Sequence, residues 1–249
     1  MYRTFEYSGN VWAGVYDLRT AKEEGDGRLF TRADVHVYPG KFLFLFTLLL
    51  FAEILRNNLP ITAIKSKPSI LQQYGHSVKY FYMEDVALIK LREPYWLDHK
   101  INSICLPTKP IDESWYGTRV QFAGWGFFDE TKNRSSILQQ VSMGIMNSEG
   151  CFRNYVSEPV PLPKKLWTEV KKKGFCTDTS PNAGTCTGDS GGAAVWKDKK
   201  DNNRAFAVGI STATDLICGP GMKPSVFSTI PGKVFEWIKK IGKDDICVV

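Results

Sequence analysis

The chain of 249 residues is 43% hydrophobic and contains 21 glycines and 13 prolines. This length supports a substantial core, and the many glycines and prolines are typical of short strands joined by turns. The formal net charge is +6, but no basic run is interleaved with aromatic residues as a nucleic-acid-binding face would be. The charge therefore indicates a solvated basic surface, and nucleic acid is excluded from the expected partners.

Residues 41–55 form an unusually apolar run that is rich in Phe and Leu. A transmembrane helix is disfavoured, because spanning a bilayer takes about 20 apolar residues and Glu53 interrupts the run sooner. A buried helix or a partner-binding patch is a second interpretation, because an exposed run of this size would be sticky. We favour a third, a translated intron over residues 41–72. Phe, Leu, Ile, Lys and Asn are the residues that AT-rich codons give, and Gly40–Phe42 and Leu71–Gln72 can be encoded by splice-like codons.

Two later segments carry patterns that predict regular structure. Asp85 leads into an alternating apolar run, Val86–Leu91, which predicts a strand. A C-terminal helix is predicted after Pro231 and Gly232, where apolar residues recur at helical spacing: Val234, Trp237, Ile238 and Ile241.

The most informative stretch is Cys186–Gly192, which reads Cys-Thr-Gly-Asp-Ser-Gly-Gly. Small residues around Ser190 let the backbone turn tightly, so that the hydroxyl is exposed and amide N–H groups point into one small space. Such N–H groups form an oxyanion hole, the donors that stabilise the tetrahedral intermediate of acyl transfer. A plain Gly-rich turn is the rival interpretation for Gly-Asp-Ser-Gly alone, and the longer run is far more specific.

Further segments match one family in the same order along the chain: Asp85–Leu91, Ile104–Pro107, Gly124–Gly126, Ser211–Ala213, Lys223–Phe227 and the C-terminal helix. By these residues and Cys186–Gly192 the chain resembles the trypsin/chymotrypsin family of serine peptidases over roughly residues 8–40 and 73–243. The resemblance implies an all-β fold of two antiparallel β-barrels with the cleft between them. Its expected parts are an incomplete N-terminal barrel over about 1–112 with the insert 41–72, a C-terminal barrel over 113–233 and an α-helix over 234–243.

The resemblance also implies catalytic roles. Ser190 is the expected nucleophile, and Asp85 is the expected residue that orients the general base. The N–H groups of Gly188 and Ser190 are the expected oxyanion donors. Asp189 has a structural role in the family, where it pairs with the freed N-terminal amine and orders the pocket and the hole.

The family's primary specificity pocket maps onto four residues. Gly184, six residues before the nucleophile, forms its base, where trypsin-like enzymes carry an aspartate. Ala213 and Ser225 replace two wall glycines and narrow the slot, and Ser211 belongs to the substrate-pairing strand. Because burying a cationic side chain without that aspartate would be costly, we expect small or medium apolar residues before the scissile bond, the P1 position.

The six cysteines are compatible with disulfides in an oxidising compartment, and sequence alone allows 15 pairings. The resemblance implies the pairs Cys186–Cys218 and Cys151–Cys176. In relatives the cysteine at the position of Cys105 often pairs with a propeptide or N-terminal segment absent here, so a Cys105–Cys247 pair is a proposal for the two cysteines that remain and is not implied by the resemblance. No cysteine or histidine has zinc-site spacing, so neither a metal nor a cofactor is expected.

The general base is the piece that the chain lacks. The family carries it in a Thr-Ala-Ala-His-Cys motif before the triad aspartate, and no such motif occurs here. His36 falls in a predicted strand, and His76 and His99 are out of order. Aligning Val11–Val15 with the family places Met1 just past the expected histidine, and an Ile-Val-Gly-Gly start is absent as well. We therefore expect negligible triad-dependent peptidase activity from this chain.

Three interpretations remain open. The first is a secreted, monomeric serine endopeptidase with protein or peptide substrates and protease inhibitors as partners, and with no membrane partner; secretion follows from the family and the cysteines, since no signal peptide is visible. The second is a non-catalytic homologue that binds a partner or peptide in the old cleft. Intact Ser190, Gly188 and Asp189 favour the first, whereas the missing base favours the second. The third is a chain that does not fold stably, because a half-barrel exposes strand edges.

Overall fold

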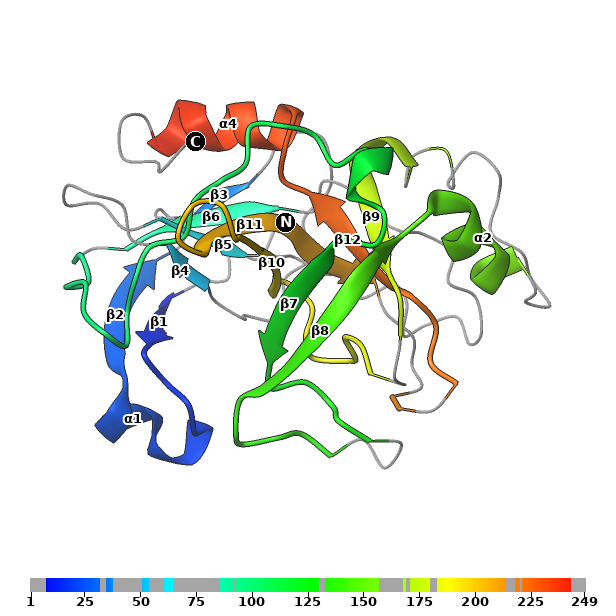
Figure 1. Cartoon of the computed structure of the whole chain (residues 1–249). Coiled ribbons are helices and arrows are strands. Elements are labelled where there is room, and N and C mark those ends of the chain that lie inside the picture. Colours follow the sequence, from blue (N-terminus) through cyan, green and yellow to red (C-terminus); the bar gives the residue numbers. More distant parts are fainter. Residues whose placement is uncertain are drawn as a thin grey trace, which may run out of the picture.

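The computed structural model is built mainly of β-strands and ends in an α-helix (Figure 1). It describes residues 8–31, 35–37, 51–53, 61–64, 86–91, 93–129, 133–156, 168, 171–179, 183–213, 218–219 and 221–242. The all-β class expected from the sequence is confirmed.

The N-terminal half contains two antiparallel sheets. In the first, β1 (Ser8–Ala13) pairs with β2 (Asp26–Thr31), and η1 (Leu18–Thr20) and α1 (Ala21–Glu24) join the two strands. The second sheet has the strand order β3-β6-β5-β4. Its strands are β3 (Val35–Val37), β4 (Phe51–Glu53), β5 (Ile61–Ile64) and β6 (Ala87–Lys90). Within the described residues this half is not closed into a barrel.

Two of these strands lie in the apolar insert 41–72. β5 pairs with β6 along its whole length, from Ile61 opposite Lys90 to Ile64 opposite Ala87, and β4 pairs with the outer side of β5. The described residues of the insert are therefore strands, not the buried helix that was one interpretation. The intron hypothesis concerns the transcript and stays a prediction.

The C-terminal half is a closed six-stranded barrel with the order β10-β11-β12-β9-β8-β7. Its strands are β7 (Arg119–Gly124), β8 (Gln139–Met146), β9 (Gly174–Thr177), β10 (Ala193–Asp198), β11 (Arg204–Ala213) and β12 (Ser225–Thr229). Val195 opposite Gln121 closes the ring between β10 and β7. Two helical elements, η4 (Glu113–Trp115) and α2 (Ser148–Val156), flank the barrel.

Alternating side chains fill the barrel. Along β7, Val120 and Phe122 are buried while Arg119 and Gln121 are exposed, as expected for a strand with one face on a core. The rings of Phe175 and Phe227 stack with their centroids 5.3 Å apart. A side chain at Gly209 would meet the Phe175 ring at 2.6 Å, so the aromatic packing requires a glycine in β11.

The last element, α4 (Lys233–Gly242), packs across both halves and lies along the top of Figure 1. Its buried residues Val234, Phe235 and Ile238 share a core cluster with Val86 before β6 and Ile210 of β11. The helix begins one residue earlier and ends one residue earlier than the sequence predicts. Among the residues that the structure describes, no helix is long and apolar enough to cross a bilayer.

Candidate active site

The loop around Ser190 contains two backbone turns that only glycine adopts readily. Gly188 has φ 101° and Gly191 has φ 92°, both in the left-handed region. Asp189 N donates to Cys186 O at 3.0 Å, and Gly192 N donates to Asp189 O at 3.0 Å. The tight loop predicted from the sequence is therefore built by hydrogen bonds on both sides of Ser190, whose residue is only 6% exposed.

Two backbone N–H groups in this loop have no acceptor. Within the described part of the chain, neither the N–H of Gly188 nor that of Ser190 donates a hydrogen bond. Backbone donors near a buried site are almost always paired. Two unpaired donors, one of them on the expected nucleophile itself, are what an oxyanion hole requires.

The loop is fixed to β11 through Ser211. Gly191 N donates to Ser211 O at 3.0 Å, and Ser211 N donates to Gly192 O at 2.8 Å. Ser211 is fully buried, and its Oγ has no hydrogen-bond partner in the described residues. Both backbone groups of the expected substrate-pairing residue thus hold the nucleophile loop in this structure.

Asp189 is buried, and its carboxylate accepts two backbone hydrogen bonds. Its Oδ1 accepts from Gly126 N and its Oδ2 accepts from Cys186 N, both at 2.9 Å. Burial raises the pKa of the Asp189 carboxyl to about 6, although the two backbone hydrogen bonds act in the opposite direction.

The position of Asp189 explains the Gly124-Trp125-Gly126 motif. A Cβ at Gly124 would lie 2.1 Å from the Asp189 Oδ1, and a Cβ at Gly126 would lie 2.5 Å from it. Neither contact is sterically allowed, so both glycines are required by the carboxylate. The sequence showed the motif but not this reason for it.

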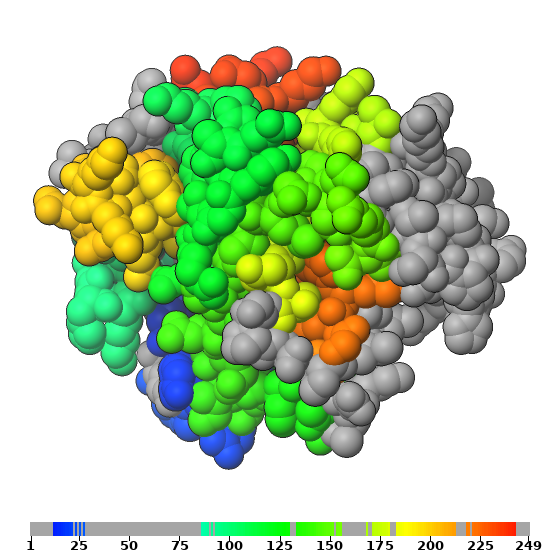
Figure 2. Space-filling view, turned by 45° about the vertical axis from the view of Figure 1, so that its right-hand side comes forward, coloured from blue at the N-terminus to red at the C-terminus, as the bar shows by residue number. Residues whose placement is uncertain are grey.

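A cavity of about 190 Å³ borders Asp189 and reaches the base of the expected specificity pocket. Gly124, Gly126 and Asp189 line one part of it, and Gly184 and Met222 line another. Figure 2 shows yellow atoms, from the part of the chain around the nucleophile loop, against orange atoms from the part that includes β12.

Two of the expected pocket residues lie together. A Cβ at Gly184 would meet Ser225 Oγ at 3.0 Å and Met222 Cε at 2.9 Å. Ser225 is fully buried, and its Oγ accepts from Thr185 N at 3.0 Å. Ala213 ends β11 opposite Val226, and its side chain lies outside the described residues. Met222 is a pocket residue that the sequence did not reveal.

The residues of the expected base–acid pair are mostly outside the described part of the chain. Asp85 and His76 lie outside it, as does the side chain of His36, whose backbone pairs with Leu88. His99 is exposed in a turn after β6. The described residues include no group of three or more His, Cys, Asp or Glu side chains that could hold a metal ion.

Two of the expected disulfides are present. Cys186 and Cys218 are joined with their Cα atoms 5.7 Å apart, so the nucleophile loop is tied to the segment before β12. Cys151 of α2 is joined to Cys176 of β9 with a Cα separation of 6.1 Å. Cys105 is also disulfide-bonded, and Cys247, its expected partner, lies outside the described residues.

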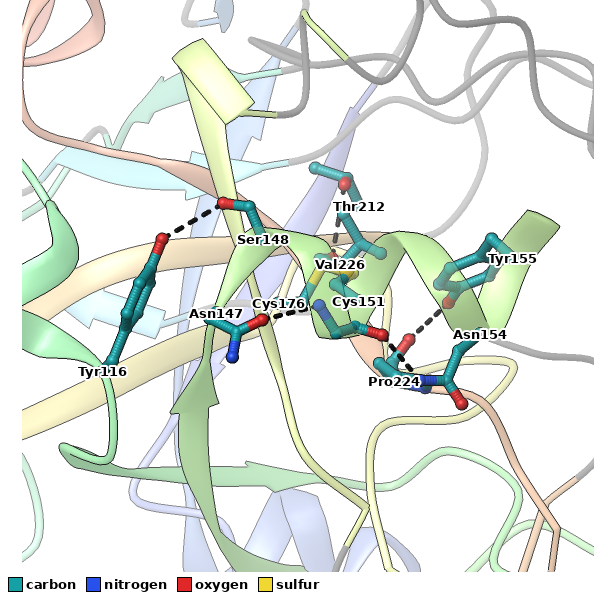
Figure 3. The surroundings of a disulfide bond; sticks show 11 residues. Tyr116, Asn147, Ser148, Cys151, Asn154, Tyr155, Cys176, Thr212, Pro224 and Val226 are labelled. Carbon is teal, nitrogen blue, oxygen red and sulfur yellow. Dashed lines mark hydrogen bonds between the residues drawn. A yellow bond between two sulfur atoms is a disulfide. The ribbon is translucent and has the colours of Figure 1, made fainter.

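Around Cys151–Cys176, hydrogen bonds extend the link from α2 to the pocket wall (Figure 3). The Tyr155 hydroxyl donates to the carbonyl of Pro224, the residue before Ser225. Thr212 Oγ1 donates to Val226 O at 3.3 Å and so joins β11 to β12. The helix, the disulfide and the two strands therefore support one side of the candidate site.

The family model for trypsin matches residues 63–238. The chain belongs to the trypsin family of serine peptidases. The resemblance seen in the motifs is thereby confirmed, and the closed C-terminal barrel is the second barrel of a trypsin-like fold.

Individual relatives of this trypsin-family chain include an activating factor, a coagulation factor and a serine protease. Phenoloxidase-activating factor 1 of Holotrichia diomphalia is 27% identical over 155 residues, which are 62% of this chain and 39% of the relative. Coagulation factor XII of Cavia porcellus is 30% identical over 166 residues, which are 64% of this chain and 26% of the relative. Mannan-binding lectin serine protease 1 of Mus musculus is 31% identical over 164 residues, which are 64% of this chain and 21% of the relative. The trypsin-family chain thus matches well under half of the length of each of these relatives.

Proposed function

We propose that this protein represents a secreted serine endopeptidase that cleaves after small or medium apolar residues. The observation that carries the proposal is the pair of unpaired N–H groups at Gly188 and Ser190, held in place by the hydrogen bonds of Asp189 and Ser211. A fold that merely needed a turn would have no use for two unpaired donors beside a serine hydroxyl.

In the complete reaction Ser190 Oγ attacks the scissile carbonyl carbon and its proton passes to a general base. The carbonyl oxygen becomes negatively charged, and the Gly188 and Ser190 N–H groups stabilise it. Collapse of the intermediate expels the amine, which takes the proton from the base, and water then hydrolyses the acyl-enzyme. Asp85 is proposed to orient the base, a histidine that this chain does not supply at the family position.

The P1 preference is proposed from the pocket residues. Gly184 places no charge at the base, so a Lys or Arg side chain would be buried without a partner. Ser225 is fully buried beside Gly184, which supports a narrow slot, and Ala213 is proposed to narrow it further. Proteins outside the cell are the proposed substrates, in keeping with the disulfides and with the names of the relatives, and protease inhibitors are proposed as further partners of a monomer.

The chain of 249 residues itself is proposed to lack triad-dependent activity. Loss of a triad member removes most of the rate and leaves only what binding and the oxyanion hole supply. The test is hydrolysis of a peptide with Ala or Val at P1 by this chain, with Ser190→Ala as the matched control. Equal, background-level rates are expected; efficient hydrolysis that Ser190→Ala abolishes would refute the proposal.

A non-catalytic role is the second candidate, favoured by the histidines. His36 occupies a strand position opposite Leu88 and His99 is exposed in a turn, so neither replaces the family's base motif. Sequencing the transcript from its 5′ end separates the candidates. An upstream Ala-His-Cys motif together with loss of Lys41 to Gln72 supports the peptidase. A transcript that starts at Met1 and retains the insert supports a binding module instead.

A further inference from the structure

The space above Gly184 is filled by the side chain of Met222. A Cβ at Gly184 would lie 2.9 Å from Met222 Cε and 3.4 Å from Met222 Sδ. In the family, a side chain at this position points into the specificity pocket, so the atoms that it would meet are those at the pocket's base. We propose that Met222 closes the base of the pocket and is a specificity-determining residue for the proposed peptidase. The inference rests on the proposed function and adds to it a residue outside the expected pocket set.

The local backbone holds Met222 in this position. Gly219 and Gly221 both have left-handed conformations, with φ 101° and 81°, which only glycine adopts without strain. Met222 N donates to Gly219 O at 3.2 Å and closes the turn. Cys218, just before the turn, is joined to Cys186, and β12 begins three residues after Met222 at Ser225. The side chain therefore enters the pocket region from a turn that is fixed at both ends.

The contacts of Met222 match those of a pocket floor. The residue is only 6% exposed, and its Cε and Sδ lie beside the Cβ position of Gly184. Ser225 Oγ stands 3.0 Å from the same Cβ position and is held by Thr185 N. A long P1 side chain would have to displace the Met222 methyl group, whereas Ala or Val would end before reaching it. Pocket depth is thus set by Met222, while Ser225 limits pocket width.

The test measures binding and needs no catalysis. Tripeptides with a free C-terminal carboxylate, ending in Ala, Val, Leu or Phe, are titrated into this chain and into Met222→Ala, together with indole as a probe of the pocket alone. A change of one methylene in an apolar pocket alters selectivity by about tenfold or more. We expect Met222→Ala to bind indole at least about tenfold more tightly than the wild-type chain does. Its affinity for the peptides that end in Phe or Leu, relative to the peptide that ends in Ala, should rise by a similar factor. Met146→Ala, at a half-buried methionine on β8, should leave the peptide ranking unchanged.

A second measurement tests the contact itself. Gly184→Ala should lower the melting temperature of the wild-type chain, because its Cβ meets Met222 Cε at 2.9 Å and Ser225 Oγ at 3.0 Å. The loss should be smaller in Met222→Ala, where the Met222 contact is absent and the Ser225 contact remains. If Met222→Ala folds poorly, Met222→Val removes the same Sδ–Cε reach and retains an apolar branch. Unchanged indole binding with no rescue of Gly184→Ala overturns the inference. If Met222→Ala gains indole binding but neither protein binds any peptide, the proposed peptidase function is overturned, whereas the placement of Met222 in the cavity beside Gly184 stands.

Discussion

The carboxylate of Asp189 determines the residues on the neighbouring strand end. Its oxygens accept from the backbone of Gly126 and Cys186, and they occupy the volume that side chains at Gly124 and Gly126 would need. The two glycines are therefore required because they leave room for the Asp189 carboxylate. We therefore expect that a single methyl group added at Gly126 disturbs the nucleophile loop, although Gly126 and Asp189 are 63 residues apart in the sequence.

Gly126→Ala is expected to destabilise the protein. The new Cβ would lie 2.5 Å from Asp189 Oδ1, so either the carboxylate or the strand end must move, and overpacking of this kind costs about 1–3 kcal/mol. Urea unfolding monitored by tryptophan fluorescence measures the effect. The control is Gly150→Ala in α2, where the nearest atom to the new Cβ, Asn147 Oδ1, lies at 3.0 Å. Equal stability of the two variants would contradict the steric role of Gly126.

Stability should also depend on pH through Asp189. Its pKa is raised from 3.8 to about 6 in the folded protein, so between these values the folded state holds a proton that the unfolded state has released. The free energy of unfolding from this group therefore falls as the pH rises from about 4 to about 6, by on the order of 3 kcal/mol. Thermal melts across this range, compared with Asp189→Asn, isolate the effect.

Asn at position 189 does not titrate and keeps one acceptor for the two backbone donors. The stability of wild type relative to Asp189→Asn should therefore decrease with rising pH over this window and level off above it. A difference that stays constant from about pH 4 to about pH 7 would show that the pKa of Asp189 is not raised.

At the scale of elements, helix α2 is joined to the barrel through strand β9. The Cys151–Cys176 disulfide spans 25 residues of sequence, and Tyr155 of the same helix bonds to the carbonyl before Ser225. Support for the expected pocket wall thus comes from a helix none of whose described residues lines the cavity beside Asp189.

Replacing both Cys151 and Cys176 by Ala is expected to lower the free energy of unfolding by about 3 kcal/mol, since the cross-link restricts the unfolded chain. Chemical denaturation of the purified chain provides the measurement. Arg153→Ala is the control on the same helix, because its exposed ion pair with Glu149 at 3.2 Å contributes only about 0.3–0.5 kcal/mol. A loss no larger than that of the control would mean that the disulfide does not stabilise the fold.

Elements whose signals are local were predictable from the sequence. The loop at Cys186–Gly192 and helix α4 each carry their own pattern, and both occur within a residue or two of the expected place. The reason for Gly126 was not predictable, because its partner Asp189 is 63 residues away. Met222 was missed for a similar reason: a lone methionine between Gly221 and Lys223 gives no sign that its side chain lies beside Gly184. Strand β4 was missed because the apolar run that contains it carries no strand-like alternation, and β5 was missed because it is only four residues long.

At the scale of the whole molecule, two sets of contacts join the N-terminal sheets to the C-terminal barrel. Near η1, Leu18 N donates to Ser136 O at 2.8 Å and Leu138 N donates to Tyr16 O at 2.9 Å. At the opposite side, α4 buries Phe235 in the cluster that contains Val86 and Ile210. The helix therefore connects the segment after Asp85 with the strand that leads to Ser211.

Phe235→Ala is expected to destabilise both halves together. Truncation of a buried phenylalanine costs about 3–5 kcal/mol, and the lost contacts lie between the halves of the chain. Differential scanning calorimetry would show the expected fall in melting temperature of a common transition. Lys239→Ala, on the exposed face of the same helix, should change stability by no more than about 0.5 kcal/mol. An unchanged transition in Phe235→Ala would indicate that α4 does not couple the halves.

The hydrogen bonding of the nucleophile loop has a consequence for amide exchange with deuterated solvent. Paired and unpaired donors alternate there: Asp189, Gly191 and Gly192 donate to backbone carbonyls, whereas Gly188 and Ser190 donate to none within the described residues. Neighbouring amides should therefore differ sharply in protection, because an unpaired amide needs no opening of the fold before it exchanges. The two expected oxyanion donors would then be fast-exchanging positions in a loop where the amides of Asp189, Gly191 and Gly192 are hydrogen-bonded.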